Sequence, residues 1–146
     1  MNPIDHGKLL LLMASKDMKA LDIMIMPESV DDEIFGFHAQ QAAEKTLKAW
    51  ISLAGGAYAK SHDLSMLLLT LHGLGCDIAD LKDVISLNAF AAQFRYEALE
   101  TDDEPLDRQA TRMLVRHAFD TVQAVLRLIE SRQERITPAH PEPVEG

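Results

Sequence analysis

The sequence predicts an all-α protein, folded as an up-and-down antiparallel bundle of four to five helices. Leu, Ala, Met and Glu dominate the composition, whereas only seven glycines and six prolines occur, and this composition favours helix over strand. No stretch shows the sustained alternation of apolar and polar residues that marks a half-buried strand. Long segments with helical periodicity are instead joined by short connections, as in antiparallel bundles.

The first helix is expected to begin at a cap formed by Asn2 or Asp5 and to end near Met26. Pro27 ends it, because the proline ring clashes with the preceding turn. Asp17 lies at the edge of the apolar stripe and not opposite it. The apolar positions follow helical spacing and are Leu10, Ala14, Leu21, Met24 and Ile25.

The second helix is expected to begin at Asp31 or Asp32, since acidic residues are favourable at a helix N-terminus. Gly55-Gly56 stops it after about Ala54. Its stretch 35–50 contains alanines that allow close approach of another helix. The same stretch carries polar residues at spacings of three or four, and these share one side of the helix: His38, Gln41, Lys45 and Lys48.

Two further helices are expected before an acidic linker at 100–104. Ser61 or Asp63 caps the first of them, which covers 63–72 and ends at Gly73 and Gly75. Its inner face is expected to consist of Leu64, Leu67, Leu68 and Leu71. The second covers 77–95, with an inner stripe of Leu81, Val84, Ile85, Ala89 and Ala92.

The last helix is expected to run from Pro105 to about Arg132, with Asp103 or Glu104 near its cap. Its expected inner stripe is Ala110, Leu114, Thr121, Val125 and Leu128. Residues 1–135 are therefore predicted to form a single domain. Residues 136–146 contain three prolines among charges and small residues, and we expect them to form a disordered tail.

The composition also limits the classes of function. A formal net charge of −9 argues against broad, charge-driven binding to nucleic acid, although it leaves room for a local basic site. Cys76 is the only cysteine, so an intrachain disulfide is excluded. No signal peptide or membrane-spanning run is apparent, and we expect a reduced, cytoplasmic protein. His6, His72 and His140 are expected in loops or at the termini. The six histidines show no metal-binding spacing, so neither a metal nor a cofactor is expected.

Four short motifs together resemble the HEPN domain family, of the type paired with minimal nucleotidyltransferases. The run Phe37-His38-Ala39-Gln40-Gln41-Ala42-Ala43-Glu44-Lys45-Thr46-Leu47-Lys48-Ala49 is similar to the family's second-helix signature. Ser61-His62-Asp63-Leu64 is similar to the start of its third helix, and Arg95-Tyr96 to the pair that ends the following helix. Asp17, followed by Lys19-Ala20, resembles the acidic position of the first helix. The resemblance covers about residues 8–130.

This resemblance implies a helical bundle, a homodimer and a nucleotidyltransferase-type partner. It also implies two activities, because many family members are ribonuclease toxins with an Arg-x4-6-His motif, whereas others are proposed to bind nucleotides. Arg112 and His117 match the motif formally, but Met113 follows the arginine where a polar residue is usual. They would act as catalytic residues only across a dimer axis. Otherwise Arg112 is solvated and His117 packs at the edge of the stripe.

The candidate nucleotide-binding residues are Gln41, Lys45, Lys48, His62, Arg95 and Tyr96. In this interpretation the lysines and Arg95 form a small basic pocket, Tyr96 stacks on a base, and His62 meets a phosphate at a helix N-terminus. In the structural alternative, Arg95 forms an ion pair with Asp17 or Glu44. Lys45 and Lys48 are then exposed or paired. Ser61 and Asp63 only cap the following helix.

Three functions follow from these alternatives. The first is a homodimeric HEPN-like binding module that partners a small nucleotidyltransferase in a toxin–antitoxin-type module and holds a nucleotide. The second is a metal-independent ribonuclease toxin that uses Arg112 and His117. The third is a purely structural dimerisation bundle. No membrane association is expected for any of them.

Overall fold

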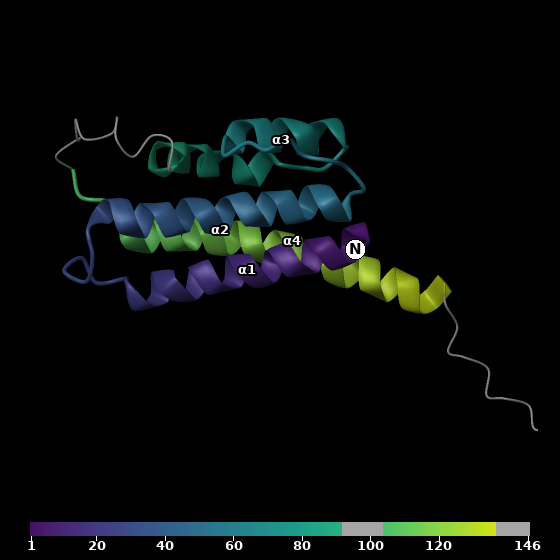
Figure 1. Ribbon diagram of the computed structural model, residues 1–146, viewed down its shortest axis with the longest axis horizontal. Helices are drawn as coiled ribbons and strands as arrows, with labels where there is room; N and C mark the ends of the chain where they lie inside the picture. The colour runs from purple at the N-terminus through teal and green to yellow at the C-terminus, as the bar shows by residue number, and fades with distance from the viewer. Residues whose placement is uncertain (92–103, 137–146) are drawn as a thin grey trace, which may run out of the picture.

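The computed structural model describes residues 1–91 and 104–136, and within these ranges the chain is helical apart from short connections. The elements are α1 (Pro3–Ile23), α2 (Asp32–Leu53), α3 (Leu64–Gly73), the 3-10 helix η1 (Ala79–Phe90) and α4 (Arg108–Ile136). Helices α1, α2 and α4 run side by side, and α3 with η1 forms a second layer over α2 (Figure 1). The predicted all-α bundle is confirmed.

Helix α2 is the centre of the bundle, because α1, α3, η1 and α4 all pack against it. Of its 22 residues, 14 are buried. Its alanines at 39, 42, 43 and 49 have no exposed surface, which confirms their predicted role in close helix packing. Gly36 also lies in this core, where a Cβ atom would approach the ring of Phe90 to 2.3 Å.

The predicted caps of α2 and α3 are confirmed in part. Asp31 is the N-cap of α2, although its side chain makes no capping hydrogen bond, and Gly55 ends the helix with φ of +79°. The side chain of Asp63 accepts a hydrogen bond from the N–H of Ser65 and so caps α3. The four predicted leucines of α3 are all buried.

Two predicted boundaries and one predicted cap were wrong by a few residues. Helix α1 ends at Ile23, before the expected Met26. Helix α4 begins at Arg108, three residues after Pro105. The cap of α4 is Asp107, whose carboxylate accepts the N–H of Ala110 at 3.0 Å, and not Asp103 or Glu104. A proline or a run of acidic residues limits the region in which a helix can end or begin. The capping hydrogen bond decides which residue is the first of the helix.

The predicted α-helix at 77–95 was also wrong. The chain forms a 3-10 helix over 79–90, in which side chains three residues apart eclipse one another. Leu81, Val84 and Leu87 therefore face the core, whereas Ile85 is 39% exposed and Ala89 is exposed. Ala92 and the rest of this predicted helix lie outside the described residues. The apolar spacing of three fits the 3-10 geometry better than the α-helical period.

The predicted inner stripe of α4 borders the buried line of the helix and does not coincide with it, although Leu114 and Val125 do pack against the core. Ala110 and Leu128 are exposed, and Leu114, Thr121 and Val125 are only partly buried. The buried line is Arg108, Thr111, Val115, Ala118, Val122 and Leu126. This line includes an arginine and a threonine, which a search for apolar residues passes over. Main-chain oxygens of the connection between α1 and α2 accept hydrogen bonds from Arg108, so it can be buried.

Helix α1 runs antiparallel to α4, and two ion pairs mark the two ends of their contact. Lys8 lies 3.1 Å from Glu130, and Asp22 lies 3.1 Å from Arg112. Among the described helices, none combines the length and apolarity needed to cross a bilayer. Helix α4 extends to Ile136, whereas the predicted tail beyond it lies outside the described residues, so the domain limits stay a prediction.

Candidate functional site

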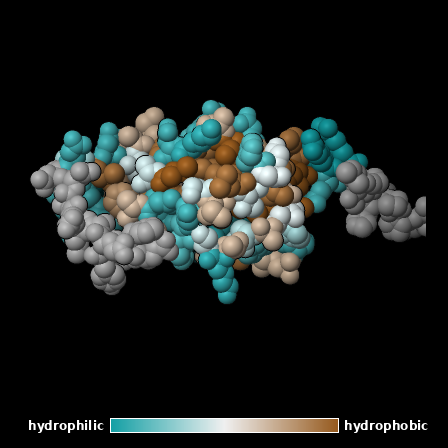
Figure 2. Space-filling model, turned by 90° about the horizontal axis from the view of Figure 1, so that it is seen from above, coloured by the Kyte–Doolittle hydropathy of each residue, from teal (hydrophilic) through white to brown (hydrophobic). Residues whose placement is uncertain are grey.

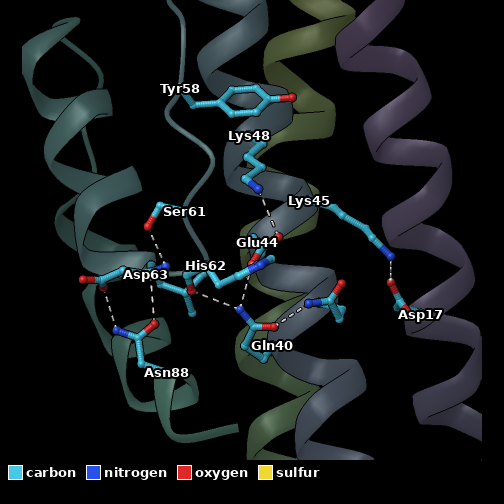
Figure 3. A network of polar contacts seen from close by, with 12 residues as sticks. Asp17, Gln40, Glu44, Lys45, Lys48, Tyr58, Ser61, His62, Asp63 and Asn88 are labelled. Atoms are coloured by element: carbon cyan, nitrogen blue, oxygen red, sulfur yellow. Dashed lines mark hydrogen bonds and ion pairs between the residues drawn. The ribbon is translucent and has the colours of Figure 1, made fainter. Parts of the chain in front are cut away.

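The candidate site is a polar surface centred on α2, which we call the polar face of α2. It consists of six residues of α2, one of α1 and two of the loop after α2. These are His38, Gln40, Gln41, Glu44, Lys45 and Lys48, then Asp17, and then Tyr58 and His62. Figure 3 shows that side chains of α2 reach in two directions. Lys45 points toward Asp17 on α1, whereas Gln40, Glu44 and Lys48 point toward the loop that leads to α3. Each turn of α2 contributes to both groups, because Gln41 follows Gln40 and Lys45 follows Glu44 in the sequence.

Glu44 is the centre of the group on the loop side. Its residue is only 5% exposed, and its carboxylate has three partners. Oε1 lies 2.8 Å from Nδ1 of His62 and accepts a hydrogen bond from Nε2 of Gln40 at 3.1 Å. Oε2 accepts from Nζ of Lys48, also at 3.1 Å. A buried carboxylate is stable only when such partners replace water, so these contacts fix the positions of all four side chains.

The imidazole of His62 is held at one nitrogen and is open at its surface. An ionised carboxylate only accepts hydrogen bonds, so Nδ1 donates to Glu44 and Nε2 is left for another partner. The side chain is 52% exposed. His62 is therefore the member of this group that is best placed to meet a molecule from solvent.

Asp17 organises the group on the α1 side in the same way. Its Oδ1 lies 3.0 Å from Nδ1 of His38, and its Oδ2 accepts from Nζ of Lys45 at 2.6 Å. The Asp17 side chain is 12% exposed and that of Lys45 is 21% exposed. The pairing of Lys45 that the sequence left open is thus present. The alternative in which the two lysines are merely exposed was wrong, because the Lys48 side chain is only 13% exposed.

Tyr58 and His6 extend the site in a way that the sequence did not suggest. Nζ of Lys48 lies 5.3 Å from the centre of the Tyr58 ring, within the range of a cation–π contact. The phenol oxygen lies 2.6 Å from Nε2 of His6. His6 was expected in a loop or terminus, but it lies in the first turns of α1. No local motif predicts the contact between His6 and Tyr58, because 52 residues separate them in the sequence.

The N-terminus of α3 is occupied by its own cap. Asp63 accepts from the N–H and Oγ of Ser65 and from Nδ2 of Asn88, at 2.6 to 2.9 Å. The side-chain hydrogen bond from Ser65 is the main cause that holds the pKa of Asp63 below its ordinary value, with further lowering by Asn88 and backbone N–H groups against the opposing effect of burial. A phosphate at this helix end would therefore meet a carboxylate. The capping interpretation of Ser61 and Asp63 is confirmed, as Oγ of Ser61 also accepts the N–H of Asp63.

Arg112 and His117, the formal ribonuclease pair, both lie on α4. Five residues of helix turn through about 500°, which leaves the two side chains about 140° apart. Arg112 donates to Asp22 and Gln109 and so is not simply solvated. His117 is exposed and not packed at the stripe's edge. One copy of the chain therefore does not bring these two side chains together.

The remaining predicted site residues have mixed outcomes. Gln41 is partly buried and donates from Nε2 to Oε1 of Gln40 at 2.8 Å, which joins it to the Glu44 group. Arg95 and Tyr96 lie outside the described residues, so their predicted pairing and stacking stay predictions. Across residues 1–91 and 104–136, no three His, Cys, Asp or Glu side chains lie together as metal ligands would.

The electrostatics of the polar face follow one rule. Each carboxylate pairs with one lysine and one histidine. Asp17 pairs with Lys45 and His38, and Glu44 pairs with Lys48 and His62. With neutral histidines the four charges cancel. With both histidines protonated, the group carries two surplus positive charges on partly exposed rings. Such an arrangement can accept an anion without leaving a buried charge unpaired.

Comparison with known proteins agrees with the motifs in the sequence. A family model described as the HEPN domain matches residues 8–132. No curated protein and no solved structure matches the chain significantly. The family match covers well over half of the chain and includes Asp17, the whole of α2 and the His62–Asp63 turn. The chain therefore belongs to the HEPN domain family.

Proposed function

We propose that this chain is a cytoplasmic HEPN-type binding module that forms a homodimer, pairs with a small nucleotidyltransferase in a toxin–antitoxin-type module, and holds a nucleotide phosphate on the polar face of α2. Support for the nucleotide comes from one observation above all. The His62 ring is half exposed, and buried Glu44 holds it through Nδ1. Nδ1 donates to Glu44, so the ring presents an outward N–H on Nε2 only when it carries a second proton, and a phosphate oxygen can then accept that hydrogen bond.

The neighbouring side chains fit the same ligand. A doubly protonated His62 would add one positive charge beside the Glu44–Lys48 pair, and a terminal phosphate carries a negative charge. Lys45 and Lys48 are already paired with carboxylates, so they fix the geometry and contribute less direct attraction. The Tyr58 ring, 5.3 Å from Nζ of Lys48, offers an aromatic surface on the same face of α2.

Titration calorimetry with ATP and GTP at millimolar concentration tests the nucleotide part. Wild-type protein should bind, and His62→Gln should weaken binding at least tenfold, because it removes the cationic form that faces the ligand. His72→Gln is a matched control, since His72 is an exposed histidine at the opposite end of α3. Absence of heat in the wild type, or equal binding by the two variants, would refute nucleotide binding at His62.

The partnership with a nucleotidyltransferase is tested independently of the ligand. The gene beside the one for this chain should encode a nucleotidyltransferase, and co-expression of the two should give a complex that survives gel filtration. A neighbouring gene of another class, together with separate elution of the two products, would remove this part of the proposal.

A metal-independent ribonuclease is the second candidate function, and one observation favours keeping it. The His117 ring is exposed on α4, where a second copy of the chain could reach it. Arg112 would first have to leave Asp22 or be supplied by the other copy. If neither nucleotide nor RNA is a ligand, the purely structural dimerisation bundle remains.

A further inference from the structure

The polar face of α2 contains one benzene ring, that of Tyr58. Among the described residues, the large hydrophobic side chains that are fully exposed all belong to Met, Leu and Ile, and Figure 2 shows hydrophobic side chains gathered on the face that α3 and η1 form. Such aliphatic surfaces have no π-face on which a planar base can stack. Tyr58, in contrast, is a partly exposed aromatic residue beside the charged side chains of the candidate site.

The rings of His6 and Tyr58 lie edge to edge and nearly in one plane. Their planes differ by 17°, and their centres are 6.1 Å apart. The phenol oxygen and Nε2 each lie in the plane of their own ring, and only 2.6 Å separates these two atoms. Two rings that lie face to face would need about 3.5 Å or more between their planes. Neither ring therefore covers the other, and together they form one nearly flat aromatic surface.

Two contacts hold this surface in place. The contact with His6 ties the loop after α2 to the first turns of α1. Nζ of Lys48 lies 5.3 Å from the centre of the Tyr58 ring, and it also donates to buried Glu44. Figure 3 shows the Tyr58 hydroxyl directed toward α1 and Lys48 between the ring and Glu44. The ammonium thus supports the ring from the side of the protein, and the partly exposed rings of His6 and Tyr58 keep surface for a ligand.

The aromatic surface and His62 are held one helical turn apart. Tyr58 contacts Lys48, and His62 contacts Glu44. Lys48 and Glu44 are four positions apart on α2, which corresponds to about 6 Å along the helix axis. In a nucleotide, a ribose separates the base from the first phosphate by a distance of the same order. One nucleotide therefore has the length to meet His62 with a phosphate and Tyr58 with its base.

We propose that the His6–Tyr58 surface stacks on the purine base of a nucleotide whose phosphate meets His62, with His6 as a positioning residue that orients the Tyr58 ring. This inference rests on the nucleotide binding in the proposed function, and it names the class of nucleotide. A purine suits two adjoining rings better than a pyrimidine, because its two fused rings cover more of a flat surface. Stacking on an aromatic ring also needs no charge, which suits a chain whose net charge of −9 repels polyanions.

Titration calorimetry with ATP, CTP and inorganic tripolyphosphate tests the proposal on the full chain. Wild-type protein should bind ATP at least about fivefold more tightly than tripolyphosphate, which carries the phosphates but no base. It should also bind ATP more tightly than CTP. Tyr58→Ala should lower the ATP affinity to that of tripolyphosphate and leave the tripolyphosphate affinity unchanged. His62→Gln should weaken both ligands equally, because it acts on the phosphate.

Tyr58→Phe tests the positioning role, because it keeps the benzene ring and removes the contact with His6. It should lower the ratio of ATP affinity to tripolyphosphate affinity about threefold. His6→Ala should lower this ratio at least as much, since it also removes the second ring, and the double variant should lose no more than His6→Ala alone. His72→Ala, at an exposed histidine of α3, is the matched control and should leave the ratio unchanged. A merely structural contact would change stability without changing this ratio.

The outcomes separate this inference from the proposed function. Equal wild-type affinity for ATP and tripolyphosphate, or a Tyr58→Ala variant that keeps the preference for ATP, would overturn the stacking and leave phosphate binding at His62 standing. Equal affinity for ATP and CTP would overturn the assignment to purines. Absence of heat with all three ligands would refute nucleotide binding itself, and the stacking with it. If circular dichroism shows that Tyr58→Ala is unfolded, Tyr58→Leu replaces it, because leucine keeps apolar bulk without a π-face.

Discussion

Removal of the guanidinium of Arg108 should destabilise the whole bundle. This side chain is only 4% exposed at the start of α4, and it binds the connection between α1 and α2. Its terminal nitrogens donate to four main-chain oxygens, at 2.5 to 3.2 Å, and to the carboxylate of Asp32 at 3.0 Å. The oxygens belong to Met24, Met26, Pro27 and Val30. The guanidinium also lies 5.1 Å from the centre of the Phe35 ring.

The magnitude follows from what Arg108→Met would leave behind. A hydrogen bond to a charged group contributes about 1.5–3 kcal/mol, and these values are not additive within one network. The connection is largely exposed and Asp32 is 38% exposed, so water can replace part of what is lost. We therefore expect a loss near the lower end of the roughly 3–5 kcal/mol measured for breaking buried ion pairs. This is a large fraction of the about 5–15 kcal/mol that stabilises a typical domain.

Urea denaturation followed by far-ultraviolet circular dichroism measures this loss. Arg127→Met is the matched control, because Arg127 is an exposed arginine on the same helix, and it should change stability by less than about 0.5 kcal/mol. If Arg108→Met does not fold, Arg108→Lys provides a milder test, since lysine keeps the charge but lacks the planar set of donors. Equal stability of Arg108→Met and Arg127→Met would refute the reasoning.

Three further predictions test other parts of the structure. Gly36→Ala should lower stability by about 1–3 kcal/mol in the same urea assay, because the new methyl group would overlap the ring of Phe90, and an unchanged midpoint would show that the ring moves freely. Asp63→Ala should cost about 1 kcal/mol at neutral pH through loss of the α3 cap. The pKa of Asp63 is lowered in the folded state, so its carboxylate stabilises the fold fully above the ordinary carboxyl pKa and loses this effect as pH falls through the lowered value. The free energies of unfolding of wild type and variant should therefore converge in acid. A difference that stays constant with pH would contradict this. Expression of wild type and His117→Ala in a bacterial host should give equal growth and intact RNA, whereas toxicity of the wild type alone would favour the ribonuclease.

Much of the fold could be predicted because its signals are local. The cap at Asp63, the stop at Gly55 and the four inward leucines of α3 each depend on residues within about one turn. Hydrophobic spacing of three and four residues is sufficient to predict such helices. The HEPN resemblance has the same origin, since each of its motifs is a short run of neighbouring residues.

The errors have a common physical cause. Which side of α4 is buried depends on the helices that pack against it, and its buried line begins with Arg108, which sequence patterns classify as a surface residue. The 3-10 form of η1 also depends on its packing over α2, where Leu81, Val84 and Leu87 make one straight line. The order of apolar residues alone does not contain the buried side of α4, and the spacing of three residues in η1 is also compatible with an α-helical stripe.

The candidate site divides in the same way. From the sequence came the polar side of the second helix and the residues Gln41, Lys45, Lys48 and His62 as a group. Only the tertiary structure determined their partners, because Asp17 is 28 residues from Lys45 and Glu44 is 18 residues from His62. A sequence states which side chains carry charge and which face of a helix they share. Burial and the packing of distant segments decide which charged side chains form ion pairs with one another. They also decide that the His62 side chain stays half exposed.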